Sequence, residues 1–215
     1  RSKCPFNPEE VWTSAITIPL KWMAAFLSGA RGTLRRTDYL ADFVGSGDDV
    51  EIVCDASPTG IGAFLVEQGS IAEYFEDALT AEDEKMLSAT RGDSTGQQVW
   101  EALSVVCALR LWSEKWAQRR IHLRVTGDSV SALTMVVKMN AKGVGTALLA
   151  RELALDVAEA LYEPLVRTHV PGVANVLADF LSRRGPHGYD ELPAPLRRAK
   201  ARQLPARDPG WWRTV

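Results

Sequence analysis

The stretch Val50-Glu-Ile-Val-Cys-Asp-Ala-Ser-Pro-Thr-Gly60-Ile-Gly-Ala-Phe-Leu-Val-Glu67 decides the fold class of this chain. It contains two runs rich in β-branched and aliphatic residues, 50–56 and 61–67, on either side of a Ser-Pro-Thr-Gly turn. A third run, residues 70–75, follows the tight turn Gln68-Gly69. These three runs predict an antiparallel meander of three strands.

The rest of the chain alternates between helical and extended patterns. Hydrophobic periodicity predicts a long helix over residues 97–116 and helices at about 130–139, 146–161 and 176–182, with strands at 121–126 and 165–170. The polar, acidic segment 77–96 predicts a loop with a helical turn near 81–89. The order βββαβααβα is typical of an α/β domain, with a five-stranded mixed sheet and helices on both faces.

Composition excludes several classes of protein. The chain has 215 residues, of which 46% are hydrophobic and 24% charged, so it can bury a full core and is not a disordered or collagen-like chain. No uncharged stretch reaches the roughly 18 residues that a membrane helix needs. Three scattered cysteines and the lack of a secretion signal predict free thiols in an intracellular, cytoplasmic or nuclear protein, not a secreted one.

Charge divides the chain into three segments. Residues 1–46 hold six basic and four acidic side chains, and the Gly-Ser-Gly-Asp-Asp run at 45–49 marks a boundary. We expect residues 1–46 to be a helical connector, with residues 8–30 helical in two pieces around Pro19. Residues 47–183 are then a catalytic domain and 184–215 a basic Pro/Arg-rich tail. The first residues, Arg-Ser-Lys-Cys-Pro, are typical of a fragment of a longer polypeptide. Residues 47–182 carry 11 basic and 20 acidic side chains, which is compatible with metal binding or with a solvated acidic surface.

Four acidic residues stand at positions that suit a shared site. Asp55 ends the first predicted strand and Asp128 follows the fourth, and ligands usually bind where the ends of such strands meet. Glu101 lies near the start of the long helix, beside its apolar side, and Asp179 lies in the last helix. Clustered carboxylates repel one another unless cations neutralise them, and two Mg²⁺ ions would also hold the oxygens of a phosphodiester.

Four segments of the chain resemble the ribonuclease H domains of retroelement reverse transcriptases. They are Asp55-Ala-Ser-Pro-Thr-Gly-Ile-Gly-Ala, Glu101-Ala-Leu-Ser, Asp128-Ser129 and His169-Val-Pro-Gly-Val-Ala-Asn175-Val-Leu-Ala-Asp179-Phe-Leu-Ser-Arg183. The resemblance covers about residues 50–183 and is nearest to LTR (Gypsy-type) and DIRS-like retrotransposons. It implies an RNase H-like fold, a polymerase domain in the same polyprotein, and two Mg²⁺ ions, which Mn²⁺ can replace. The implied activity is hydrolysis of the RNA strand of RNA–DNA hybrids, leaving a 3′-hydroxyl and a 5′-phosphate.

The resemblance also assigns roles to residues. It implies that Asp55, Glu101, Asp128 and Asp179 bind the metal ions, and that His169 positions water or helps to release product. Glu82 and Glu84 are rivals of Glu101 for the second ligand, because the gap after Asp55 is long. Further candidates for contact with the substrate are Ser57, Gly60, Ser129, Asn175 and Arg183.

Simpler roles remain open for some of these residues. Ser57 and Gly60 suit a tight turn, and Asn175 suits the start of a helix. Trp211 and Trp212 suit either stacking on bases or docking of the tail on the domain.

Two other functions also remain open. One is a DNA-cutting enzyme of the same fold, such as an integrase, transposase or resolvase, and the other is an inactive structural module. The presence of all four acids argues against the inactive module.

Overall fold

A mixed sheet of six strands organises the part of the chain that the computed structural model describes, residues 13–29, 48–116, 121–159, 164–169, 171–187 and 191–213. The strand order is β5-β4-β1-β2-β3-β6. The strands are β1 (Asp48–Ala56), β2 (Gly60–Glu67), β3 (Ser70–Ala78), β4 (Ile121–Gly127), β5 (Pro164–His169) and β6 (Lys200–Ala201). The five predicted strands and their order along the chain are confirmed, and β6 is an addition from the tail.

Strand direction in the sheet follows from the connections. Short turns join β1, β2 and β3, which therefore pair antiparallel, with Asp55 opposite Gly62. A long helical connection precedes β4, which pairs parallel with β1, and β5 pairs parallel with β4. The carboxyl ends of β1 and β4 consequently meet at one edge of the sheet.

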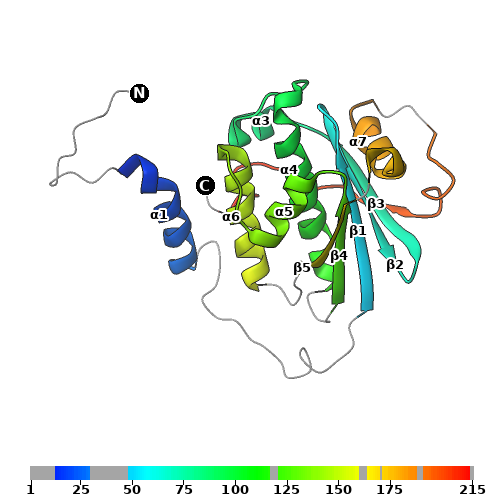
Figure 1. The fold of residues 1–215 in the computed structure, drawn as a ribbon, viewed down its shortest axis with the longest axis horizontal. Coiled ribbons are helices and arrows are strands. Elements are labelled where there is room, and N and C mark those ends of the chain that lie inside the picture. The colour runs from blue at the N-terminus through cyan, green and yellow to red at the C-terminus, as the bar shows by residue number, and fades with distance from the viewer. Residues whose placement is uncertain are drawn as a thin grey trace.

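Helices cover both faces of the sheet, as Figure 1 shows. On one face lie α4 (Gln97–Leu111), α5 (Val130–Lys138) and α6 (Val144–Glu159), and on the other lies α7 (Val176–His187). Nearly all of β2 is buried, because α4 packs on one side of it and α7 on the other. The larger apolar core lies under α4, and a smaller one under α7 includes Phe64, Leu181 and Leu196.

One helix differs from the expectation and another confirms it. The helix α1 (Thr13–Leu27) is continuous and contains Pro19, so the prediction of two pieces is wrong. Proline removes one amide donor from a helix but its fixed φ is helical, so the helix continues at the loss of one hydrogen bond. The helical turn expected in segment 77–96 is α3 (Ala81–Leu87), which begins with a capping box between Thr80 and Asp83. None of the helices in the described ranges is long and apolar enough to cross a membrane.

The tail folds back onto the domain. The Trp212 side chain is fully buried in the main core. Of the two roles left open for Trp211 and Trp212, stacking on bases or docking of the tail on the domain, the structure therefore supports docking. Arg202 pairs with Glu73, and Arg207 with Asp77 and Asp83. These arginines of the basic tail therefore neutralise three of the acidic side chains in residues 73–84.

Candidate active site

Asp55 lies at the end of β1, where the strand passes between the two helical layers. Its side chain is only 3% exposed. Alternation along β1 places the side chains of Ile52 and Cys54 in the core under α4. The Asp55 carboxylate at the end of this strand therefore lies in a site with little access to solvent.

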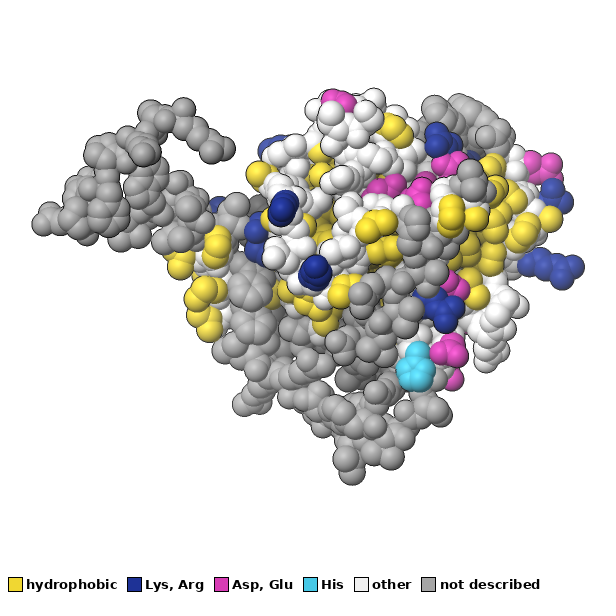
Figure 2. All heavy atoms as spheres, viewed as in Figure 1, with side chains coloured by type: hydrophobic (Ala, Val, Ile, Leu, Met, Phe, Trp, Pro, Cys, Tyr) yellow, Lys and Arg dark blue, Asp and Glu magenta, His cyan; other side chains and the backbone are white. Residues whose placement is uncertain are grey.

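Three carboxylates converge at this edge of the sheet. Asp55 from β1, Glu101 from α4 and Asp128 after β4 each offer one oxygen, and these oxygens all lie within 4.8 Å of one another. In Figure 2, a few acidic side chains lie at the surface in the upper part of this view, and others are scattered toward its right and lower edges. The sequence-based expectation that these three residues meet is confirmed by this geometry.

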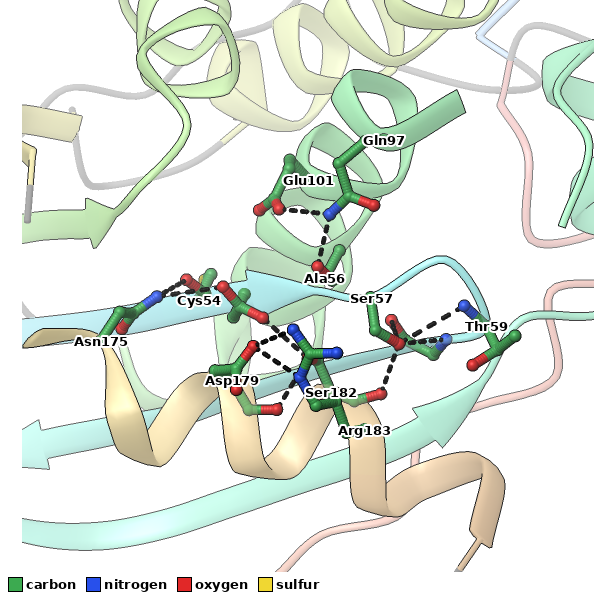
Figure 3. Close-up of polar contacts among 12 residues, drawn as sticks. Cys54, Ala56, Ser57, Thr59, Gln97, Glu101, Asn175, Asp179, Ser182 and Arg183 are labelled. Atoms are coloured by element: carbon green, nitrogen blue, oxygen red, sulfur yellow. Dashed lines mark hydrogen bonds and ion pairs between the residues drawn. The ribbon is translucent and has the colours of Figure 1, made fainter. Parts of the chain in front are cut away.

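The carboxylate of Asp55 is held through both of its oxygens. The Asn175 side chain donates to Oδ1 at 3.2 Å, and the Ser182 hydroxyl donates to Oδ2 at 2.7 Å (Figure 3). The Asn175 amide also donates to the backbone carbonyl of Cys54 at 3.2 Å. Asn175 thus contacts the carboxylate and the strand that carries it.

Glu101 is held by a residue one helical turn earlier. The Gln97 amide donates to Glu101 Oε1 at 2.7 Å and to the carbonyl of Ala56 at 2.5 Å, which ties α4 to the end of β1 (Figure 3). The rival residues take part in other contacts: Glu84 accepts from Arg91, and Glu82 pairs with Lys85. Among the described residues, Glu101 is therefore the glutamate that lies with Asp55 and Asp128 in the carboxylate cluster, rather than Glu82 or Glu84.

The electrostatics of the cluster favour a cation. Burial, with the charges of Asp128 and Asp179, raises the pKa of Asp55 to about 7. Burial and the charge of Asp55 raise the pKa of Glu101 to about 9. Both carboxyl groups thus resist ionisation, and a divalent cation between them would relieve this repulsion. Hard oxygen donors of this kind suit Mg²⁺ or Mn²⁺, so the residues present fit these ions.

Asp179 lies near this cluster but outside the group of three. It stands in the first turn of α7, its side chain is 41% exposed, and it forms an ion pair with Arg183 at 2.7 Å. Its charge contributes to the raised pKa of Asp55. The structure therefore joins three of the four predicted acids and places the fourth beside them, paired with a predicted substrate-binding arginine.

His169 and Ser129 lie on the elements that border Asp128. His169 ends β5 opposite Gly127, the residue before Asp128, while its side chain lies outside the described part of the structure. Ser129 caps α5, with its hydroxyl accepting from the Ala132 amide at 3.3 Å. The functional roles of both residues remain predictions.

Ser57 and Gly60 serve the turn between β1 and β2. Ser57 is buried, and its hydroxyl accepts from the Gly60 amide at 2.9 Å and donates to the carbonyl of Ser182 at 2.9 Å. The single hydroxyl proton is used inside the fold, so it is not available to a phosphate. The structure thus gives both residues a role in the turn, and their contact with the substrate remains a prediction.

Gly62 lets α7 approach the sheet closely. A Cβ atom on this residue would lie 2.5 Å from Cβ of Leu181 and 2.6 Å from the backbone nitrogen of Ser182. Real Cβ atoms do not approach so closely, so a larger residue would push α7 away from β2. The second glycine of the Gly-Ile-Gly run thus explains how Ser182 reaches Asp55.

Sequence reasoning missed Gln97 and Ser182 as functional candidates. Gln97 had a usable signal, because a residue four positions before Glu101 shares its helix face. Ser182 stands three residues after Asp179 in the last motif, but nothing in the local pattern pairs it with Asp55, 127 positions earlier.

The topology places this site in a known architecture. A three-stranded meander, the helix α4, and the parallel strands β4 and β5 bring the acids to the junction of β1 and β4, with α7 on the opposite face. The fold is RNase H-like. This confirms the fold expected from the sequence.

Comparisons with known proteins return solved structures only, since neither a protein-family model nor a curated protein matches the chain. RNase H1 from the halophilic archaeon Halobacterium salinarum NRC-1 is 17% identical, with a TM-score of 0.48 over 65% of this chain and 98% of that chain. LC11-RNase H1 from compost is 16% identical, with a TM-score of 0.47 over 66% and 96%. The N-terminal RNase H domain of rv2228c from Mycobacterium tuberculosis is 18% identical, with a TM-score of 0.46 over 62% and 95%.

Proposed function

We propose that this chain is a ribonuclease H that hydrolyses the RNA strand of RNA–DNA hybrids. The observation that carries the proposal is the convergence of Asp55, Glu101 and Asp128, from three separate elements of an RNase H-like fold, with oxygens within 4.8 Å. The motif resemblance adds the context of a reverse transcriptase polyprotein of an LTR or DIRS-like retroelement. In that context residues 1–46 connect a polymerase domain to the nuclease.

The proposed cofactor is a pair of divalent cations, Mg²⁺ or Mn²⁺. Asp55, Glu101 and Asp128 would hold them, and Asp179 would join as the fourth ligand in place of its ion pair with Arg183. Bound there, the cations would lower the pKa of water and neutralise charge on the phosphodiester.

The protein's own residues supply position and charge around this site. The carboxylates of Asp55 and Glu101 are oriented by hydrogen bonds from Ser182, Asn175 and Gln97. Arg183 is exposed beside Asp179, where its guanidinium can contact a phosphate of the substrate. Recognition of the hybrid would then rest on duplex shape, phosphates and the 2′-hydroxyls of the RNA strand rather than on base edges.

A nuclease assay with the full chain tests this function. End-labelled RNA–DNA hybrid, double-stranded DNA and double-stranded RNA are incubated separately with Mg²⁺, and each in parallel with EDTA. We expect cleavage of the RNA in the hybrid only, its loss in EDTA, and at least about a 100-fold lower rate for Asp128→Asn, since removal of a metal ligand removes the cation-dependent step.

The other functions give different outcomes in the same assay. Cleavage of double-stranded DNA would support a DNA-cutting enzyme of this fold. Absence of cleavage together with absence of saturable Mn²⁺ binding would identify an inactive structural module. Asp128→Asn cutting as fast as wild type would refute the site assignment.

A further inference from the structure

Asp55 lies on β1, but its carboxylate is held by Ser182 of α7 and by Asn175, the residue directly before this helix. We propose that Ser182 and Asn175 are positioning residues, which fix the Asp55 carboxylate so that it can bind metal; this inference rests on the proposed function. The structure assigns one donor to each carboxylate oxygen, Asn175 to Oδ1 at 3.2 Å and Ser182 to Oδ2 at 2.7 Å (Figure 3). Neither donor belongs to the cluster of carboxylates.

The number of protons that the two donor side chains can donate fixes the orientation of the Asp55 carboxylate. A serine hydroxyl has one proton, and two acceptors lie within reach of it, Asp55 Oδ2 at 2.7 Å and the carbonyl of Asp179 at 2.9 Å. Asp55 Oδ2 is the nearer acceptor, and it is also the stronger one once the carboxylate is ionised to bind metal, so the proton goes to Asp55. The Asn175 amide can donate twice, and it donates both to Asp55 and to the Cys54 carbonyl.

Burial makes these hydrogen bonds persistent. Ser182 is fully buried and Asn175 is 3% exposed, so water does not compete for their donors. Rotation of the Asp55 carboxylate would leave buried polar groups without partners, which costs more than the loss of an exposed hydrogen bond. The remaining lone pairs of Asp55 are thus kept available on the side of Glu101 and Asp128.

The backbone of α7 is itself fixed at this point. Its close approach to β2 depends on Gly62, and the Ser57 hydroxyl donates to the carbonyl of Ser182 at 2.9 Å. Two residues further along α7, Arg184 forms an ion pair with Glu76 of β3. Ser182 therefore stands on a firmly docked helix and Asn175 stands directly before it, so the position of Asp55 depends on the docking of α7.

Metal affinity is the property that this arrangement predicts. Partners that orient metal ligands typically change affinity by about 10- to 100-fold when they are removed. We expect Ser182→Ala and Asn175→Ala each to weaken Mn²⁺ binding to the full chain by about 10-fold or more, measured by titration calorimetry. Cleavage of the hybrid should fall through kcat with little change in KM, and should recover when Mn²⁺ is raised.

A buried serine on the opposite face of the sheet provides the matched control. Ser104 on α4 is also fully buried, and its hydroxyl donates to a backbone carbonyl, that of Gly62 at 3.2 Å. Ser104→Ala removes the same atoms but no bond to a carboxylate, so we expect it to bind Mn²⁺ as wild type does. Thermal unfolding of each variant shows that the comparison is made on folded protein, and Asn175→Ala decides the question if Ser182→Ala does not fold.

The outcomes separate this inference from the function on which it rests. If wild type binds Mn²⁺ and cleaves the hybrid, but the folded Ser182 and Asn175 variants bind Mn²⁺ equally tightly, the positioning role is overturned and the function stands. A loss of activity that excess Mn²⁺ does not restore would likewise overturn it, because a merely structural defect gives that result. If wild type binds no Mn²⁺, the proposed function itself fails.

Discussion

The guanidinium of Arg207 lies buried against the carboxylate of Asp83, 124 positions earlier in the chain. Nε donates to Oδ1 at 2.8 Å and Nη2 to Oδ2 at 2.9 Å, which is a bidentate pair. Asp83 also takes part in the capping box of α3 through the Thr80 amide and hydroxyl. Arg207 of the tail thus neutralises the buried carboxylate of Asp83 at the start of α3.

Loss of this pair should destabilise the protein. Arg207→Ala leaves the buried Asp83 charge without its partner, and we expect the free energy of unfolding to fall by about 3–5 kcal/mol. Urea unfolding followed by circular dichroism measures the change. Arg197, whose ion pair with Glu191 is exposed, is the control, and Arg197→Ala should cost less than about 1 kcal/mol. Equal effects of both substitutions would contradict a structural role for the buried pair.

Substitution of Gly62 should act on both stability and metal binding. In Gly62→Ala the new Cβ would clash with Leu181 and with the backbone of Ser182, so α7 must shift. We expect a loss of about 1–3 kcal/mol in the free energy of unfolding, as for an overpacked core, and weaker Mn²⁺ binding. The control is Gly69→Asn, because asparagine tolerates the left-handed backbone of this open turn. Unchanged Mn²⁺ binding in Gly62→Ala would mean that the docking of α7 does not set the geometry of Asp55.

Glu101 and its rival can be separated by a pair of isosteric substitutions. Glu101→Gln removes one charge from the cluster and should lower the cleavage rate by at least about 100-fold, because a metal ligand is lost. Glu84→Gln touches a glutamate that pairs with Arg91 instead, and should leave the rate within about twofold of wild type. The opposite pattern, measured as hybrid cleavage at saturating Mg²⁺, would transfer the metal-binding role to Glu84.

The stability of the metal-free protein should depend on pH at this site. Folding raises the pKa of Glu101 to about 9 and that of Asp55 to about 7, so the folded state binds more protons than the unfolded state. The contribution of these groups is fully present below their unfolded pKa values, near 4, and is lost as the pH rises toward 9. Without metal we therefore expect the free energy of unfolding to fall from pH 5 to pH 9.

The dependence on metal provides the control for this prediction. Mg²⁺ binds the ionised carboxylates, so the stabilisation that it adds should grow over the same pH range. Glu101→Gln removes the main titrating group and should flatten the profile of the metal-free protein. Stability that rises with pH in wild type, measured by urea unfolding in EDTA, would show that the carboxylates of this site are not held in their neutral form.

Local sequence determined the strands and helices, and it determined the strand ends at which Asp55 and Asp128 lie. The meander from β1 to β3 follows from two tight turns between runs with β propensity, and the position of Asp55 follows from where β1 ends. Asp128 was placed in the same way, at the end of β4. These features depend on residues near one another in the chain, so periodicity and turn chemistry were enough to predict them.

Only the tertiary structure decided which polar side chains meet. The bond from Ser182 to Asp55 and the pair of Arg207 with Asp83 each join residues more than 120 positions apart, where no local pattern records the contact. Docking of α7 and of the tail creates both contacts, because burial leaves a polar group only the partners that packing brings to it. The exposed pair of Asp179 with Arg183 stands on one helix, yet its distance from the three clustered acids also depends on how α7 docks.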